Sequence, residues 1–127
     1  MKLTKINSEY APSADGGYSQ AILTQDAANL LFISGQIPET NAGNTPEDFE
    51  SQCRLVWSNI ISQLEASDMG IANLVKITIF LSSRDYAKIN SRVRQEFLAN
   101  NSPALTVIIT GIFDEKWLLE IEAIAAS

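Results

Sequence analysis

The segment Leu74–Leu81 (LVKITIFL) carries apolar side chains on both of the faces that a β-strand presents. Successive side chains of a strand point to opposite faces. The odd-numbered positions here are all apolar, and Leu74 and Phe80 make the other face apolar as well. The segment Leu105–Ile109 repeats the pattern, with Ile108 on the second face. A sheet built from these strands needs cover on both faces, because soluble proteins do not leave large apolar surfaces wet.

Only two segments have the apolar spacing of helices. Thr45 can cap the first helix, Pro46 suits its first position, and the two acids that follow complement the positive end of the helix dipole. The second helix begins at about Ser83. Two helices cover one face of a sheet, so we expect the other face to be buried in an oligomer. The apolar stripes are Phe49, Cys53, Val56, Trp57, Ile60, Ile61 and Leu64 in the first helix, and Tyr86, Ile89, Val93 and Phe97 in the second.

The strands and helices are interleaved, which predicts a sheet with helices packed on it, and the length of the chain predicts a single domain over residues 1–127. Residues 10–17 are expected to form a loop, since they hold a proline and two adjacent glycines. The second and third strands follow each other in the chain, and we expect them to pair. The predicted strands are Lys2–Asn7 at an edge, Tyr18–Leu23, Leu30–Ile37, Leu74–Leu81, Leu105–Thr110 and Trp117–Ala125.

The chain has no histidine. This absence removes the Ser-His-Asp and Cys-His catalytic sets and any histidine-based metal site. General acid–base chemistry falls to Asp, Glu, Tyr, Lys or ordered water. We expect no metal and no cofactor.

The net charge of −6 argues against nucleic acid as a partner, because phosphate contacts need clustered cations. The nearest basic cluster, Lys88, Arg92 and Arg94 with Arg84, is interpreted as the solvated face of a helix. No apolar run approaches the ~20 residues that span a bilayer, and the N-terminus lacks the apolar core of a secretory signal. The lone Cys53 excludes an internal disulfide and fits a reducing compartment. We therefore expect a cytoplasmic protein without a membrane partner.

Several motifs in this chain resemble those of the RidA family, also called YjgF or L-PSP. The resemblance runs from about Tyr10 to Ala125, and the motifs occur in the family's order and at its spacing. The motifs are Gly16–Gln20 (GGYSQ, for the family's GPYSQ), Ser34–Pro38 (SGQIP, identical), Val75–Leu81 (VKITIFL, for VKTTVFL), Asn90, and Glu120–Ala125 (EIEAIA, identical).

The resemblance implies a chorismate-mutase-like α+β fold, with a mixed six-stranded sheet backed by two helices. It also implies a homotrimer with the sheets inward and a small-molecule ligand in a cleft at each subunit interface. Well-studied members hydrolyse the enamine and imine products of amino-acid dehydratases to 2-keto acids and ammonia. Other members have been described as ribonucleases or translation inhibitors, which an acidic chain matches poorly.

The chain departs from the family at the residue that clamps the substrate carboxylate. Active members carry Pro-Ala-Arg-Ser, whereas residues 103–106 read Pro-Ala-Leu-Thr, so Leu105 stands where the arginine is expected. A guanidinium holds a carboxylate through two parallel hydrogen bonds, and leucine offers neither bond nor charge. Loss of one partner of such a pair costs roughly 2–5 kcal/mol. We expect weak or absent activity on small 2-imino acids.

The resemblance also nominates the residues of the cleft. Glu120 would activate or position a water at an imine carbon, or it is a carboxylate on a half-solvated strand. Tyr18 would supply a ring wall or a hydrogen bond, or it packs on the sheet. Ser34 and Gly35 would place donors near a carbonyl, or they form a bulge. The other candidates are Asn90, which alternatively orders a neighbouring strand or loop, and Leu105, Thr106 and Val107, which line the altered pocket or pack in the core.

Two functions from different classes remain open. One is an imine-deaminase-type hydrolase whose specificity is altered toward neutral or more apolar substrates. The other is a non-catalytic trimeric protein that binds a small metabolite in the same cleft. The Glu120 carboxylate favours the hydrolase, and Leu105 favours the binding protein.

Overall fold

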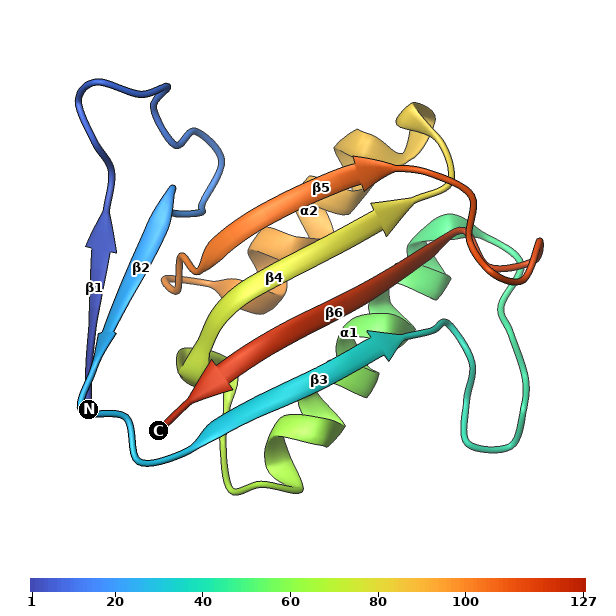
Figure 1. The fold of residues 1–127 in the computed structure, drawn as a ribbon. Helices are drawn as coiled ribbons and strands as arrows, with labels where there is room; N and C mark the ends of the chain where they lie inside the picture. Colours follow the sequence, from blue (N-terminus) through green and yellow to red (C-terminus); the bar gives the residue numbers. More distant parts are fainter.

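The structure is a computed structural model that describes residues 1–127. Strands and helices are interleaved along the chain, as the sequence predicts (Figure 1). Two short 3-10 turns precede β4 and α2. The predicted α+β architecture, a mixed sheet backed by two helices, is confirmed. The elements are β1 (Lys2–Ile6), β2 (Ala21–Gln25), β3 (Leu30–Gln36), α1 (Phe49–Glu65), β4 (Leu74–Leu81), α2 (Ala87–Leu98), β5 (Ala104–Ile109) and β6 (Leu119–Ala126).

The six strands are divided between two sheets rather than joined in the expected single one. Four of them form a mixed sheet in the order β3-β6-β4-β5, in which β5 lies parallel to β4 at the edge. The antiparallel hairpin of β1 and β2 stands apart in Figure 1. One bridge, Ser19 to Ala104, links the two sheets. The Ser19 hydroxyl donates to the Ser102 carbonyl at 2.6 Å, so the contact is made where β5 begins and does not continue along it.

β2 and β3 do not pair with each other, contrary to the expectation from their adjacency. The chain turns at Asp26, which has a φ of 56°. The residues that lead into β3 then bond to the C-terminus, where the N–H groups of Ala28 and Asn29 donate to the Ser127 carbonyl at 2.8 and 3.0 Å. These bonds align β3 with β6, and β2 is left to pair with β1.

Both helices pack on one face of the four-stranded sheet, behind it in Figure 1. The predicted stripe of α1 is buried there except for the half-buried Ile61, and Trp57 is fully enclosed. Aromatic pairs join the two helical segments: the ring of Phe49 stacks on Tyr86 at 4.4 Å, and that of Trp57 on Phe97 at 5.8 Å. Burial of these large side chains supplies the main driving force for packing the helices on the sheet.

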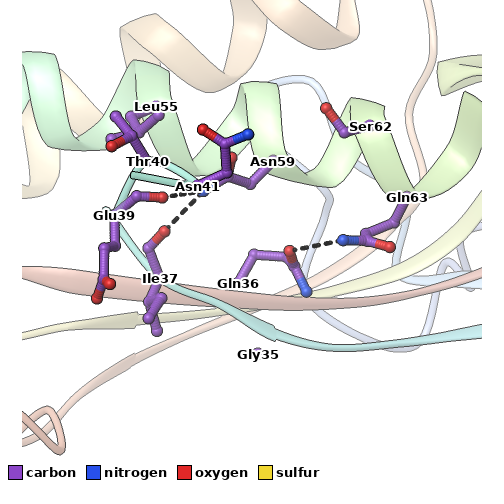
Figure 2. Close-up of a pocket in the computed structure, with 10 residues that line it drawn as sticks. All are labelled: Gly35, Gln36, Ile37, Glu39, Thr40, Asn41, Leu55, Asn59, Ser62 and Gln63. Atoms are coloured by element: carbon purple, nitrogen blue, oxygen red, sulfur yellow. Dashed lines mark hydrogen bonds between the residues drawn. The ribbon is translucent and has the colours of Figure 1, made fainter. Parts of the chain in front are cut away.

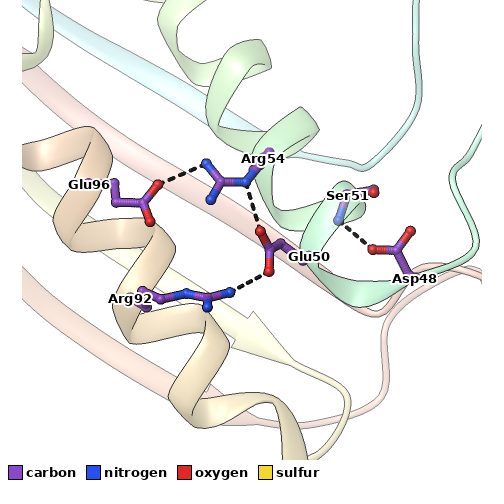
Figure 3. A network of polar contacts seen from close by, with 6 residues as sticks. All are labelled: Asp48, Glu50, Ser51, Arg54, Arg92 and Glu96. Carbon is purple, nitrogen blue, oxygen red and sulfur yellow. Dashed lines mark hydrogen bonds and ion pairs between the residues drawn. The ribbon is translucent and has the colours of Figure 1, made fainter.

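α1 begins at Phe49, later than the predicted first position at Pro46. Asp48 caps the helix in place of Thr45, and its Oδ2 accepts a hydrogen bond from the Ser51 N–H at 2.9 Å (Figure 3). This bond lowers the pKa of the Asp48 carboxyl below its usual range. Pro46 stays outside the helix, and its carbonyl accepts a hydrogen bond from Nε2 of Gln52 at 2.8 Å.

An ion-pair network joins the solvent-facing sides of α1 and α2 (Figure 3). Arg54 pairs with Glu50 at 3.2 Å and with Glu96 at 2.9 Å, and Arg92 also pairs with Glu50. Water screens such exposed pairs, so they add little to stability. Arg92 therefore lies on a solvated face, as predicted.

The face of the sheet opposite the helices has no cover in the single chain. Residues paired across neighbouring strands share a face. On this face Phe32 pairs with Ile124, and Phe80 pairs with Glu120. Phe32 is 70% exposed and Leu30 is 57% exposed. The sheet thus presents an open, partly apolar face, as the two-faced strands predict. Neither helix combines the length and the hydropathy needed to cross a membrane.

Candidate functional site

The Glu120 side chain lies directly against the backbone of Gly35. A β-carbon at Gly35 would lie 1.9 Å from Oε2 of Glu120, so any larger residue would displace the carboxylate. The register of β3 against β6 shifts between Ile33 and Gln36. This irregularity is the β-bulge that Ser34 and Gly35 were alternatively expected to form. It turns position 35 toward Glu120.

A hollow of about 230 Å³ opens beside Glu120. Its walls are Phe80 and residues 110–113, which follow β5. Phe113 is 95% exposed to solvent. Glu120 is half-buried, and no cationic side chain lines this hollow. The carboxylate is thus within reach of a small molecule, but nothing here would hold a substrate carboxylate.

A second hollow, of about 350 Å³, brings together Tyr18, Leu105 and Val107. It lies between the loop before β2, the helix α2 and the edge strand β5. Leu105 pairs with the fully buried Ile77 and packs against the core. This hollow is therefore on the helix-covered face of the sheet, whereas Glu120 is on the open face.

Arg94 of α2 lines the hollow that contains Leu105. The residue is only 4% exposed, so its assignment to a solvated face was wrong. Burial lowers the pKa of its guanidinium. Helical spacing carries the signal for this residue, since Asn90, Val93, Arg94 and Leu98 form one buried stripe at intervals of three and four residues.

The remaining candidate residues do not line the hollow beside Glu120. Asn90 is 1% exposed, and its Oδ1 has no hydrogen-bond partner. Thr106 faces the open side of the sheet, and its hydroxyl accepts a hydrogen bond from Nζ of Lys76 at 2.6 Å. The side chain of Ser34 makes no hydrogen bond, but its carbonyl accepts one from Nε2 of Gln36 at 2.9 Å. The single chain therefore groups Glu120 with Gly35, and Tyr18 with Leu105 and Val107.

A third pocket, of about 660 Å³, lies between α1 and the loop after β3 (Figure 2). Amide and hydroxyl side chains dominate its lining, and Gly35 is the only predicted site residue among them. Asn59 donates from Nδ2 to the carbonyls of Ile37 and Glu39 at 2.9 and 3.1 Å, which ties the loop to the helix. No group of three or more Asp, Glu or Cys side chains is arranged to hold a metal ion.

A family model described as Endoribonuclease L-PSP matches residues 8–127, nearly the whole chain. The chain belongs to the RidA (YjgF, L-PSP) family. Relatives of this RidA-family chain include a RutC family protein of Pyrococcus horikoshii, which is 38% identical over 94% of each chain. The 2-iminobutanoate/2-iminopropanoate deaminase of Escherichia coli K12 is 32% identical, again over 94% of each chain.

Solved structures agree with this RidA-family assignment. The Rid-family protein YyfB of Yersinia pestis superposes with a TM-score of 0.86 over the whole of both chains, and at 22% identity it supports the fold alone. Escherichia coli TdcF, solved with bound serine, gives a TM-score of 0.73 at 26% identity over 98% of each chain. The family resemblance of the sequence motifs is thereby confirmed.

Proposed function

We propose that the chain hydrolyses small reactive enamines or imines at Glu120, with a specificity altered by Leu105. The position of the Glu120 carboxylate carries this proposal, because it lies over Gly35 and beside a hollow that a small metabolite fits. The reaction class is supported by the Escherichia coli relative, whose name assigns it 2-iminobutanoate and 2-iminopropanoate as substrates.

In the proposed reaction a water molecule adds to the imine carbon while Glu120 accepts one of its protons. The new C–O bond forms as the π electrons move to nitrogen, which takes the proton from Glu120 to give a carbinolamine. The nitrogen then takes up a second proton and leaves as ammonia, and the hydroxyl proton is lost as the carbonyl forms. Imine and water become ketone and ammonia, so the reaction needs no oxidant or reductant.

The lining of the hollow beside Glu120 adds to the change in specificity expected from Leu105. Phe80 and residues 110–113 present apolar and backbone surface, and no arginine or lysine is among them. A substrate carboxylate placed there would lose water without gaining a counter-charge. The proposed substrates are therefore neutral or apolar imines rather than small 2-imino acids.

We also propose that the protein is a homotrimer with its open sheet faces inward and a ligand cleft at each subunit interface. The exposed Phe32 and Leu30 on the open face support burial against another copy. The positions of Glu120 and Tyr18 on different faces support a cleft completed by a neighbouring subunit.

The test generates 2-imino acids in situ with an amino-acid oxidase or a dehydratase, and imines without a carboxylate with an amine oxidase, and follows their decay with and without the protein. Apolar and carboxylate-bearing imines are compared for wild type, Glu120→Gln and the control Glu122→Gln, an exposed residue on the same strand. Glu120→Gln should lower kcat at least about 100-fold, and Glu122→Gln should not. Equal rates for wild type and Glu120→Gln would exclude this mechanism.

A second function, non-catalytic binding of a small metabolite, is favoured by one observation: no cation lies in the hollow at Glu120 to orient a charged substrate. If the protein only binds a metabolite, the metabolite should raise the melting temperature of the protein, and the rate of imine decay should stay unchanged. Equilibrium binding together with an unaltered rate for every imine would select this function.

A further inference from the structure

The pocket between α1 and the loop after β3 has mainly polar walls (Figure 2). Its volume of about 660 Å³ is within the range of small-molecule sites in proteins. Glu120 does not line it, and neither does any residue of α2 or β5. The pocket is therefore separate from the hollow beside Glu120 and from the one that contains Leu105.

The helix α1 presents free oxygen atoms to this pocket. Asn59 donates from Nδ2 to the carbonyls of Ile37 and Glu39 at 2.9 and 3.1 Å, which uses both of its N–H groups and leaves Oδ1 as a free acceptor (Figure 2). The Ser62 hydroxyl donates to the Ser58 carbonyl at 3.0 Å, so its oxygen is also left to accept. Asn59 and Ser62 are three residues apart, which places these two acceptors on the same side of the helix.

The two glutamines of the lining extend this arrangement. Nε2 of Gln36 donates to the Ser34 carbonyl at 2.9 Å, and its Oε1 accepts a hydrogen bond from Nε2 of Gln63 at 3.4 Å (Figure 2). The Oε1 atom of Gln63 therefore stays free. Donors remain on the Thr40 hydroxyl, the Asn41 amide and the second N–H of each glutamine, but none of these groups is charged.

The charge of the lining decides which ligand fits. Glu39 is its only charged residue, and none of the ion pairs of the chain includes it. An anion would meet this carboxylate and the free oxygens without a counter-charge, whereas a cation with N–H groups finds both charge and acceptors. A single carboxylate is too little for a hard metal ion, which prefers several. The apolar side chains of Leu55 and Ile37 can contact a short alkyl chain.

We propose that this pocket binds a small primary alkylammonium ion. Its three N–H groups donate to Oδ1 of Asn59 and to neighbouring free oxygens, its charge is balanced by Glu39, and its alkyl chain lies against Leu55 and Ile37. This binding site goes beyond the hydrolysis proposed above, because it requires no reaction at Glu120.

The experiment uses butylammonium chloride as the probe, in calorimetric titrations of the full chain at neutral pH and constant ionic strength. Butyltrimethylammonium keeps the charge and has no N–H group, and 1-butanol keeps the chain and has no charge. Butylammonium should bind at least about tenfold more tightly than either solute, because only it makes charged hydrogen bonds.

Three variants locate the site. Ser62→Lys places a cation in the pocket from an exposed position of α1 and should abolish the binding. Ser51→Lys is the matched control, since Ser51 is also exposed on α1 but does not line the pocket, and it should bind like wild type. Glu39→Gln removes the negative charge and should weaken the binding at least about tenfold.

The proposal is overturned if either comparison solute binds as tightly as butylammonium, or if Ser62→Lys or Glu39→Gln binds it like wild type. An equal loss of binding in Ser51→Lys and Ser62→Lys would also overturn it, because the cation would then be attracted to the acidic chain as a whole. Glu120→Gln should bind butylammonium normally. The imine assay and the butylammonium titration can therefore fail independently.

Discussion

Leu105 and Glu120 point to opposite faces of the four-stranded sheet. Leu105 pairs with the buried Ile77 on the face that the helices cover, whereas Glu120 pairs with Phe80 on the open face. An arginine at position 105 would therefore not face the Glu120 carboxylate of its own chain. The guanidinium that shares a hollow with Leu105 comes from Arg94 of α2. Leu105 thus replaces the family arginine beside a hollow that already contains the buried Arg94.

Leu105→Arg should therefore destabilise the protein. The new side chain would lose the apolar contact of Leu105 with the core and place a second cation beside Arg94, which no carboxylate of the chain pairs. We expect a loss of at least about 2 kcal/mol in the free energy of unfolding, measured by urea denaturation. Leu105→Met, which keeps the volume and adds no charge, is the control and should cost less than about 1.5 kcal/mol.

The double variant Leu105→Arg with Arg94→Met separates charge from size. Removing the first cation should recover about 1 kcal/mol or more of the loss, since residues in contact couple by roughly 0.5–3 kcal/mol. If the effects of the two substitutions on the free energy of unfolding are additive, Arg94 does not interact with the side chain at position 105.

Gly35→Ala should displace the Glu120 carboxylate. The added β-carbon would lie 1.9 Å from Oε2, and the side chain must move away. We expect imine hydrolysis to fall at least about tenfold, because even small misplacements of a reacting group are costly. Gly70→Ala is the control, since nothing lies within 4 Å of its β-carbon and its φ of −137° suits alanine. Full activity in Gly35→Ala would show that the carboxylate has no role in this position.

The sequence predicts most of the fold because its elements have strong periodicity. The strand Leu74–Leu81 has the predicted bounds, and the core stripe of α1 is buried as expected except at Ile61. The separation of the β1–β2 hairpin was not predictable, since it depends on long-range hydrogen bonds such as the one that the Ala28 N–H donates to the Ser127 carbonyl. Arg94 was missed because its charge outweighed its spacing on the buried stripe of α2. Contact between Glu120 and Gly35 depends on a bulge whose register only the folded sheet sets.

The Cys53 thiol should make stability fall at alkaline pH. Burial raises the pKa of this thiol to about 12, whereas an unfolded cysteine ionises near ~8.5. Because the pKa is raised in the folded protein, the buried thiol contributes fully to the free energy of unfolding below the unfolded pKa. This contribution is lost as the pH rises toward 12. Urea titrations between about pH 8 and 11 should show wild type losing up to ~1.4 kcal/mol per pH unit more than Cys53→Ala. Parallel pH profiles for the two proteins would contradict this assignment.

RNA should be neither bound specifically nor cleaved at physiological salt. The net charge of −6 and the absence of histidine remove the usual phosphate contacts and the usual base. The family model that matches the chain is described as an endoribonuclease, so the assay is a direct one. Cleavage that persists through further purification and disappears in Glu120→Ala would contradict the expectation.

Phe32→Glu should break the proposed trimer. Phe32 is 70% exposed on the open face of the sheet, where a second copy would cover it, and a buried carboxylate there would lack a counter-charge. Tyr10→Glu, at a loop aromatic that is 92% exposed, is the matched control and should leave the assembly intact. Light scattering on a sizing column gives the mass of each variant. We expect three subunits for wild type and Tyr10→Glu, and one for Phe32→Glu. A wild-type monomer at micromolar concentration would exclude both the trimer and a cleft shared between subunits, because the open face would then carry no partner.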